Sequence, residues 1–508
     1  MIMKNIVNGA RRMGWKKNNK LLGEKPMCRG KIFISIIFVC SSMVFSKEVF
    51  IGRIDKEIVP GTFVISPDGR KTAFIVRRNN KYAVVLNGKE SKRYDDIRKG
   101  SLVFSPDSKE LAYIAKEGDK WLVVVERDQM RKESKKYDGI GKDPFSFGGY
   151  SAKLLYGPKG QLVYTAQEYN SNTREEEYFI VMNEKEGKRY DYISPNSLTF
   201  SDNGITFAYV ALRDKKMFVV VNGEEGKYYD GVARITLYDD GKKFAYVAGT
   251  TVKNINNDGN KVAGKWFAVI NGKEEKKYDG VGSIVFSPDG RSYVYPVRKG
   301  KKYFVVVNGK ETGGYEEILV MPYFTSHGEK VVWVAGEGGK QFVVINGKIE
   351  KKYEKVESRV IFNFDCSRYA YLVKESNKYF VVDSGKEGKR YELIDEHSII
   401  FSPDGSHLVY SARQDNKSFV VIDGKEQKRY DDIGRGSTQF SPDGKFLVYI
   451  AREGKYYFVV INEKEYKKYY SVGEIKNNGN VIFDDNKRFH YIAFRGKEIY
   501  CVEDKLKD

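Results

Sequence analysis

The chain has 508 residues, which is more than one ordinary domain, and a net charge of +20. It contains 37 Tyr and 30 Phe but few helical patterns, so the composition favours an all-β fold. Residues 1–46 contribute +8 of the net charge, which leaves +12 for the rest of the chain. No segment resembles a nucleic-acid-binding motif, and we therefore expect no nucleic-acid partner.

The first 46 residues are predicted to be an N-terminal extension that ends in a signal peptide. Residues 32–45 form a mostly apolar run that is short for a membrane span and typical of a signal-peptide core. Arg29 and Lys31 supply the positive flank, and cleavage is expected after Ser46. The mature chain is then periplasmic or secreted, with no stable membrane span. An uncleaved membrane anchor, a lipoprotein and an intracellular protein stay open as alternatives.

One sequence phrase recurs eleven times in the rest of the chain, usually at a step of 38 or 39 residues. Its full form is Phe-Ser-Pro-Asp-Gly, an Ala-Tyr pair, Phe-Val-Val-Val-Asn-Gly-Lys-Glu and Lys-Arg-Tyr-Asp, most of which stands in residues 440–469. An apolar anchor precedes the first turn of each repeat, at Ile65, Phe104, Tyr156, Phe200, Leu237, Phe286, Phe324, Phe362, Phe401, Phe440 and Phe483.

Each repeat is predicted to form four short strands, called a to d in chain order. Ser-Pro-Asp-Gly turns the chain between strands a and b, because Pro presets φ and Gly relieves the strain at the end of the turn. Asn-Gly closes the hairpin between strands c and d, because a type I′ turn requires positive φ at both central positions. Strand d is charged and ends in Tyr-Asp or Tyr-Glu, so we expect it to be the edge strand of its unit.

A period near 40 built from short strands predicts the blades of a β-propeller. Eleven blades exceed the usual four to eight of one ring, so the sequence favours two tandem propellers, residues 47–276 and 277–508. Residues 53–58 resemble a strand d that would close the first ring, and residues 277–279 could close the second. A split into four and seven blades and one large closed ring stay open.

The Phe-Ser-Pro-Asp-Gly phrase with its Ala-Tyr pair resembles the repeat of TolB-like, WD-repeat-like β-propellers. It is clearest in residues 104–113, 286–295, 401–410 and 440–449, and the resemblance covers almost all of residues 50–508. The resemblance implies the fold and is nearly silent on function. The sequence shows neither the separate domain that precedes the propeller in TolB nor the Gly-x-Ser-x-Gly elbow of hydrolases that carry a similar propeller.

Residues that recur in every blade are interpreted as structural. This applies to the Asp of Ser-Pro-Asp-Gly and to the Tyr-Asp of strand d. The four histidines, His327, His397, His407 and His490, have no Cys at ligand spacing, so we expect no metal and no cofactor. Residues 256–260 carry oxygen ligands suited to Ca²⁺, but such a string is typical of a polar loop.

Insertions into the repeat are predicted to mark the functional surface. The b–c and d–a connections lie at the same end of every antiparallel blade, and the longest insertions, residues 141–153, 167–177 and 249–265, all belong to them. Loops on a rigid scaffold commonly carry recognition. The alternative is that these loops only cover the ring. The predicted partner-binding residues are Phe145, Phe147, Tyr150, Tyr169 and Arg174.

The expected function is that of an exported, monomeric and non-enzymatic scaffold of the cell envelope. Its partner is expected to be a protein or, given the positive charge of the repeats, an anionic glycan. The alternative is a propeller enzyme, a lyase or hydrolase with its site in the mouth of a ring. Paired carboxylates and a basic residue that face one channel would favour that alternative.

Overall fold

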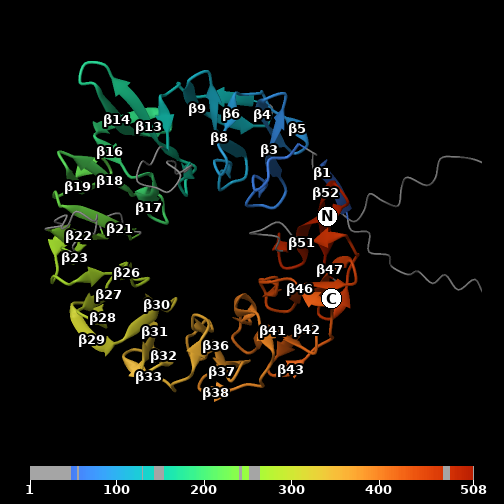
Figure 1. Cartoon of the computed structure of the whole chain (residues 1–508). Coiled ribbons are helices and arrows are strands. Elements are labelled where there is room, and N and C mark those ends of the chain that lie inside the picture. The colour runs from blue at the N-terminus through green and yellow to red at the C-terminus, as the bar shows by residue number, and fades with distance from the viewer. Residues whose placement is uncertain are drawn as a thin grey trace, which may run out of the picture. The chain divides into compact units, whose positions relative to one another are not determined.

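The computed structural model describes residues 47–53, 57–128, 130–141, 154–238, 243–250, 264–472 and 481–506. Within these ranges the protein is all-β: apart from two short 3₁₀ turns, η1 (Pro195–Ser197) and η2 (Glu396–Ser398), every element is a strand. Residues 46–508 form one compact unit. The strands make eleven antiparallel sheets, which are the blades of one β-propeller ring (Figure 1).

Each blade runs from strand a at the centre of the ring to strand d at its rim (Figure 1). Strand a is a single strand in two blades, β21 (Gly231–Leu237) and β30 (Glu317–Phe324), and in blade 1 it consists of β2 (Val64–Ile65) and an isolated bridge from Ile58 to Val76. In the other blades it is broken into two pieces, β6 (Asp96–Ile97) and β7 (Val103–Phe104), β11 (Gly139–Ile140) and β12 (Leu155–Tyr156), β16 (Tyr192–Ile193) and β17 (Thr199–Phe200), β25 (Gly280–Val281) and β26 (Val285–Phe286), β34 (Lys355–Val356) and β35 (Ile361–Phe362), β39 (Leu393–Ile394) and β40 (Ile400–Phe401), β44 (Asp432–Ile433) and β45 (Gln439–Phe440), and β49 (Ser471–Val472) and β50 (Ile482–Phe483).

Strands b and c form the long hairpin of each blade. Strand b is β3 (Thr72–Arg78), β8 (Glu110–Glu117), β13 (Leu162–Asn170), β18 (Phe207–Arg213), β22 (Phe244–Thr250), β27 (Tyr293–Lys299), β31 (Val331–Glu337), β36 (Tyr369–Glu375), β41 (Leu408–Gln414), β46 (Leu447–Glu453) and β51 (Arg488–Arg495). Strand c is β4 (Lys81–Leu86), β9 (Lys120–Arg127), β14 (Glu175–Met182), β19 (Lys216–Val221), β23 (Lys265–Ile270), β28 (Lys302–Val307), β32 (Lys340–Ile345), β37 (Lys378–Asp383), β42 (Lys417–Ile422), β47 (Tyr456–Ile461) and β52 (Glu498–Lys505).

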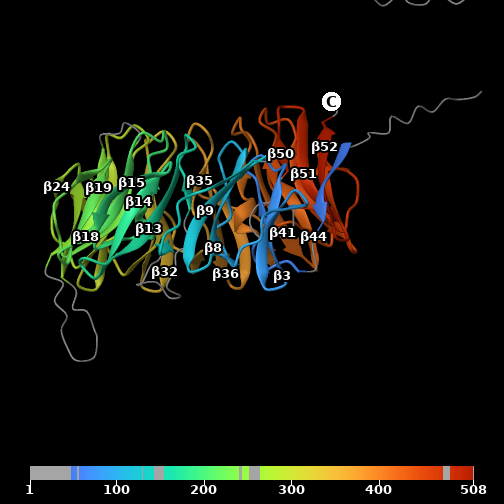
Figure 2. The ribbon, with the colours of Figure 1, turned by 90° about the horizontal axis from the view of Figure 1, so that it is seen from above.

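Strand d lies at the rim. It is β5 (Lys89–Glu90), β10 (Met130–Glu133), β15 (Lys185–Tyr190), β20 (Glu224–Glu225), β24 (Lys273–Glu274), β29 (Lys310–Tyr315), β33 (Lys348–Ile349), β38 (Lys386–Glu387), β43 (Lys425–Glu426), β48 (Lys464–Glu465) and, in the eleventh blade, β1 (Lys47–Arg53). Figure 2 shows the ring edge-on, with strands running from one face to the other. We call the face with the b–c and d–a connections the loop face, and the face with the a–b and c–d turns the turn face.

The two predicted turns are confirmed. In blade 1 the amide of Gly69 donates to the carbonyl of Ser66 at 2.8 Å, and the Ser66 hydroxyl donates to Asp68 at 2.5 Å. Asn87 and Gly88 have φ of 48° and 78°, the positive values that a type I′ hairpin requires. The Asp of Ser-Pro-Asp-Gly therefore holds its own turn.

A serine or threonine bridges the break in the inner strand. Ser101 Oγ donates to the carbonyl of Arg98 at 2.7 Å and accepts the amide of Ile114 in strand b at 3.1 Å. It thus satisfies a ladder amide at the point where strand a bulges away. The same pair of contacts is made by Thr62, Ser197, Ser398 and Ser437.

The hydrophobic core lies between neighbouring blades. The tyrosine that follows strand d inserts its ring against strands b and c of the next blade, and Tyr137 lies 6.3 Å from Tyr164 and 5.7 Å from Phe179, centroid to centroid. Edge-to-face contacts of this kind add to the gain from burial. The tyrosines with an equivalent contact, all buried, are Tyr94, Tyr190, Tyr229, Tyr315, Tyr353, Tyr391, Tyr430 and Tyr469.

The lysines and glutamates of strand d join blades at the rim. Lys92 Nζ lies 3.0 Å from the Glu133 carboxylate of the next blade, and the Tyr94 hydroxyl donates to the same carboxylate at 2.7 Å. This explains why Lys-Glu and Lys-x-Tyr recur with the period of the blades. Equivalent ion pairs are Lys135–Glu186, Lys188–Glu225, Lys227–Glu274, Lys276–Glu311, Lys351–Glu387, Lys389–Glu426 and Lys428–Glu465.

In the blades where an Asp or Glu follows this tyrosine, the carboxylate has a second structural role, on the loop face. Asp279 pairs with Lys265 of its own blade at 2.5 Å and accepts the amide of Gly300, in the b–c turn of the next blade, at 2.7 Å. The predicted structural role of Tyr-Asp is therefore confirmed. The other carboxylates that accept an amide of the next b–c connection are Asp95, Asp138, Asp191, Glu316, Glu354, Glu392 and Asp431.

Strand β1 closes the ring. It pairs with β52, and Lys47 and Glu48 stand opposite Glu503 and Val502, as Lys89 and Glu90 stand opposite Leu86 and Val85 in blade 1. Glu48 accepts the Tyr469 hydroxyl at 2.6 Å and pairs with Lys467 at 2.8 Å and Arg495 at 2.5 Å. Burial by itself would raise the pKa of Glu48, but these partners outweigh it and lower that pKa.

The closing strand lies six residues earlier than predicted. The expectation that residues 53–58 form it is wrong, because Ile58 bridges to Val76 in strand b of blade 1, and the amide of Val59 donates to the carbonyl of Ile75 at 2.8 Å. Ile58 and Val59 therefore belong to the inner side of the first blade. The Lys-Glu pair that strand d requires is Lys47-Glu48.

The preferred interpretation as two tandem propellers is also wrong, and the alternative of one large ring is confirmed. No change in packing marks the proposed boundary between residues 276 and 277 in the described chain. Val247 and Ile270 of one blade pack with Tyr278 and Tyr295 in a single buried cluster across it. Strand β1, at the start of the repeats, completes the last blade, so the first and the last blade belong to the same ring.

Glu311 links two blades and is expected to give a pH-dependent contribution to stability. It pairs with Lys276 and Lys299 and accepts the Tyr278 hydroxyl at 2.8 Å. The lysines outweigh partial burial and lower the pKa of Glu311 to about 2. Because this value lies below the usual 4.5, the unfolded chain binds more protons between the two values. The contribution is thus complete above pH 4.5 and is lost as pH falls towards 2.

We expect Glu311→Gln to lower the free energy of unfolding by ~1 kcal/mol at pH 7, as for a partly exposed ion pair. The difference from the unmodified protein should shrink as pH falls below 4.5. Urea unfolding at a series of pH values measures it. A difference that does not change with pH would show that Glu311 acts through packing and not through its charge.

Candidate functional site

Two of the predicted partner-binding residues lie on an extended hairpin of the loop face. The β13–β14 pairing continues to Asn170 opposite Glu175, whereas the corresponding hairpin of blade 2 ends at Glu117 opposite Lys120. Tyr169 stands near its end with 56% of its surface exposed. The extension therefore carries an exposed aromatic side chain beyond the length of the blade 2 hairpin.

The tip of this hairpin is held by its own hydrogen bonds. Arg174 adopts φ of 61°, and its amide donates to the carbonyl of Asn170 at 2.8 Å. The Asn170 side chain accepts the amide of Asn172 at 2.9 Å, and the amide of Tyr169 donates to Asp138 at 3.0 Å. The insertion is thus a built hairpin with a defined shape.

The remaining predicted residues are not placed. Phe145, Phe147, Tyr150 and the expected cleavage position Ser46 lie outside the described residues, as do most of residues 141–153 and 249–265. The structure places Tyr169 and Arg174 on one hairpin. The contribution of Phe145, Phe147 and Tyr150 to a binding surface stays a prediction.

The turn face carries a hollow between blades 8 and 9 that sequence reasoning missed. It has a volume of about 400 Å³ and is lined by residues 361–364 and 399–403, which are the ends of strand a and the following turns of the two blades. Phe364 at its edge is 73% exposed. A large apolar side chain this exposed next to a hollow suits an apolar group of a partner.

The turn beside this hollow departs from Ser-Pro-Asp-Gly. Phe364 takes the position of Pro, and Cys366 takes that of Gly, with φ of 57°. The His327 ring of blade 7 meets Phe364 edge-on at 5.0 Å, and His327 Nδ1 lies 3.9 Å from the buried Cys366 Sγ. The signal was present in the sequence, because His327 and Cys366 are one repeat apart and such residues face each other across a blade junction.

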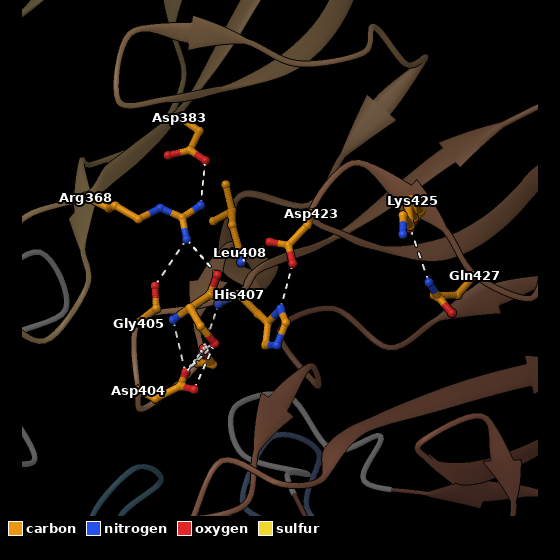
Figure 3. A network of polar contacts seen from close by, with 11 residues as sticks. Arg368, Asp383, Asp404, Gly405, His407, Leu408, Asp423, Lys425 and Gln427 are labelled. Carbon is orange, nitrogen blue, oxygen red and sulfur yellow. Dashed lines mark hydrogen bonds and ion pairs between the residues drawn. The ribbon is translucent and has the colours of Figure 1, made fainter.

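Figure 3 shows how the adjoining turns are fixed. Arg368 pairs with Asp383 at 2.7 Å and donates to the carbonyls of Gly405 and Ser406 in the next blade at 3.2 and 2.8 Å. The guanidinium therefore ties blade 8 to the a–b turn of blade 9. This turn begins at Ser402 and Pro403, which line the hollow.

The ionisable groups of this network serve the turns. The hydroxyls of Ser402 and Ser406 and the Ser406 amide donate to Asp404 and lower its pKa to about 2. His407 Nδ1 lies 2.6 Å from Asp423 (Figure 3). The serine hydroxyls are thus directed at a carboxylate and not at the imidazole, so the geometry lacks the nucleophile–base contact of a catalytic triad.

The described ranges lack two kinds of feature. They bring together no group of three or more His, Cys, Asp or Glu that could hold a metal ion. Within the same residues, no helix has the length and apolar character of a membrane span.

The fold defines the chain as an eleven-bladed β-propeller. No protein-family profile matches it, and no curated protein matches it. Among solved structures, it is similar to a eukaryotic initiation factor, with 10% identity, 78% of this chain and 97% of that chain covered and a TM-score of 0.37. It is also similar to the Dos1 propeller (11% identity, 79% and 90% covered, TM-score 0.29) and to TolB from Acinetobacter baumannii (17% identity, 53% and 79% covered, TM-score 0.23). At these identities and scores the similarity says nothing about a partner or an activity.

Proposed function

We propose that the protein is an exported, non-enzymatic β-propeller scaffold of the cell envelope that binds a macromolecule through its loop face. The observation that carries the proposal is the extended β13–β14 hairpin, which presents Tyr169, 56% exposed, on a rigid ring. Exposed aromatic residues on ordered loops are typical of interfaces. The partner is a protein or an anionic glycan, in keeping with the positive charge of the repeats.

The position of the closing strand supports export. Cleavage after Ser46 would remove the apolar run and leave β1, which begins at Lys47, whole. A mature chain cut at this position keeps every contact that Glu48 makes to Tyr469, Lys467 and Arg495. The ring then closes without any part of the signal peptide.

The use of the recurring charges supports a binding role over catalysis. The carboxylates of strand d and of the a–b turns accept hydrogen bonds from turns, tyrosines and lysines of the scaffold. These carboxylates therefore recur because each blade needs them for its own structure. The turn-face hollow with Phe364 is the second candidate surface for the same function, because of the exposure of that side chain.

We expect the hairpin to be dispensable for folding and needed for binding. Replacing residues 169–176 by Gly-Asp reproduces the turn of blade 2, and the new Gly amide can donate to Asp138 as Gly118 donates to Asp95. The thermal midpoint should stay within a few degrees. Capture of the partner from native envelope should weaken at least about tenfold, or ~1.4 kcal/mol.

The matched control for this variant is Phe364→Ser on the opposite face. If that substitution weakens capture and the shortened hairpin does not, the partner binds the turn face. If the shortened hairpin unfolds the protein, the insertion is a structural cover and the proposed binding face is wrong.

A further inference from the structure

The junction between blades 10 and 11 departs from the others at two positions at once. In blade 9 the first residue of strand c is Lys417, which pairs with Asp431 at 2.8 Å. In blade 10 the same two positions are Tyr456 and Tyr470. They flank the bridge between Tyr457 and Tyr469, so they face each other as the lysine and aspartate do elsewhere.

The two tyrosines form an exposed aromatic pair on the loop face. Their ring centroids are 5.6 Å apart and their planes are inclined by 41°. Tyr456 is 37% exposed and Tyr470 is 54% exposed. Lys455 Nζ lies 5.4 Å from the centroid of Tyr456 and 5.7 Å from that of Tyr470. An ion pair is thus replaced by two phenols with an ammonium beside both.

We call the part of the loop face with Tyr456, Tyr470, Lys455 and Lys497 the corner. The exchange of Asp for Tyr470 also removes a carboxylate from it. At the preceding junction Asp431 accepts the amide of Gly454 at 2.6 Å. The equivalent b–c turn of blade 11 is Gly496-Lys497, which is exposed, and Tyr470 stands where its carboxylate partner would be. A phenol is uncharged at neutral pH. The corner therefore holds aromatic rings, Lys455 and Lys497 without the anion that the repeat supplies at this position.

Acidic groups of the adjoining strands already have partners, and Glu498, next to Lys497, accepts the Tyr500 hydroxyl at 2.7 Å. Glu453 at the end of β46 lies 3.0 Å from Lys468, and Asp431 is held by Lys417. An anion from outside would thus meet the lysines and not these carboxylates. The +12 charge of the residues after 46 favours such an anion at long range.

We propose that this corner binds a uronic-acid residue of an acidic glycan, an inference that rests on the proposed scaffold function and names its partner. The sugar carboxylate takes the place of the missing aspartate, next to Lys455 and the Gly496 turn. The C–H face of the pyranose packs on the rings of Tyr456 and Tyr470, and their hydroxyls meet sugar hydroxyls. Two exposed aromatic rings suit the C–H face of a sugar ring better than an acidic peptide, whose acidic side chains offer no such face.

The test measures binding of hexagalacturonate to the chain that begins at Lys47, by calorimetry at low salt. The key variant is the double substitution Tyr456→Lys and Tyr470→Asp, which restores the ion pair of the other blades. It should keep the thermal midpoint and bind hexagalacturonate at least about tenfold more weakly. The methyl-esterified hexasaccharide, which lacks the charge, should also bind at least about tenfold more weakly.

Tyr228→Ala, which removes an exposed tyrosine from another blade, serves as the matched control and should bind hexagalacturonate unchanged. Equal binding of the acid and its ester, or of the double variant and the unmodified chain, would overturn the inference. Tighter binding of hexaglutamate would overturn it in favour of an acidic peptide. Absence of binding at millimolar hexagalacturonate would overturn it as well, while the scaffold function stands or fails on the capture experiment with the shortened hairpin.

Discussion

A chain that begins at Ile54 and lacks β1 is expected to unfold at a much lower urea concentration than a chain that begins at Lys47. The loss includes Ile51, whose burial against Ile492 and Ile499 contributes about 1.5–3 kcal/mol. It also includes Glu48, whose hydrogen bonds to charged partners contribute about 1.5–3 kcal/mol. We expect a total loss of roughly 3–6 kcal/mol, measured by urea unfolding followed by circular dichroism.

The effect should reach beyond the eleventh blade. Blades contact only their neighbours, so without its closing strand the ring is held shut only by direct contacts between blades 1 and 11, such as Arg70–Asp484 at 2.9 Å. We therefore expect the unfolding transition to broaden as well as to shift. A synthetic peptide of residues 47–53 added in excess should restore part of the midpoint. Equal midpoints for the two chains would show that β1 does not close the ring.

The blades and their turns could be predicted because their signals are local. Asn87-Gly88 has the positive φ values that the hairpin requires, and Ser66 and Asp68 make the predicted turn. The period of 38 or 39 residues reports one supersecondary unit. Each of these statements depends on residues that are neighbours in sequence.

The number of blades in the ring could not be predicted, because it depends on the angle between blades and not on any blade alone. The junctions between consecutive blades use the same buried tyrosine after strand d, which we call the tyrosine wedge, so the sequence does not distinguish a junction inside a ring from one at a boundary. The closing strand was misplaced for a related reason. Lys47-Glu48 matches the Lys-Glu of the other blades, but no Asn-Gly precedes it, since its partner β52 lies at the other end of the chain.

Some candidate surfaces could likewise be predicted from local signals, and others could not. Tyr169 was found from the length of its loop, which is a local signal. The exposure of Phe364 and the pairing of Tyr456 with Tyr470 were missed, because they depend on which residues face each other across strands or blades. The useful signal was a departure from the repeat at two positions that the fold brings together.

The second large effect is expected at the tyrosine wedge. Tyr229 is buried, with its ring centroid 6.1 Å from Tyr246 and 5.7 Å from Phe267, and its hydroxyl donates to Glu274 at 3.2 Å. Tyr229→Ala leaves a cavity between two blades that the rigid sheets cannot fill. We expect a loss of about 3–5 kcal/mol in the free energy of unfolding, as for other buried aromatic residues.

Two matched variants separate the ring from the hydroxyl and from surface effects. Tyr229→Phe keeps the wedge and loses only the hydrogen bond, so it should lose about 1 kcal/mol. Tyr228→Ala removes a neighbouring tyrosine that is 42% exposed, and its loss should stay near 1 kcal/mol. Urea unfolding of the three variants decides between these roles. If Tyr228→Ala and Tyr229→Ala lose the same free energy, the wedge between blades is not what holds the ring together, and the recurrence of this tyrosine needs another explanation.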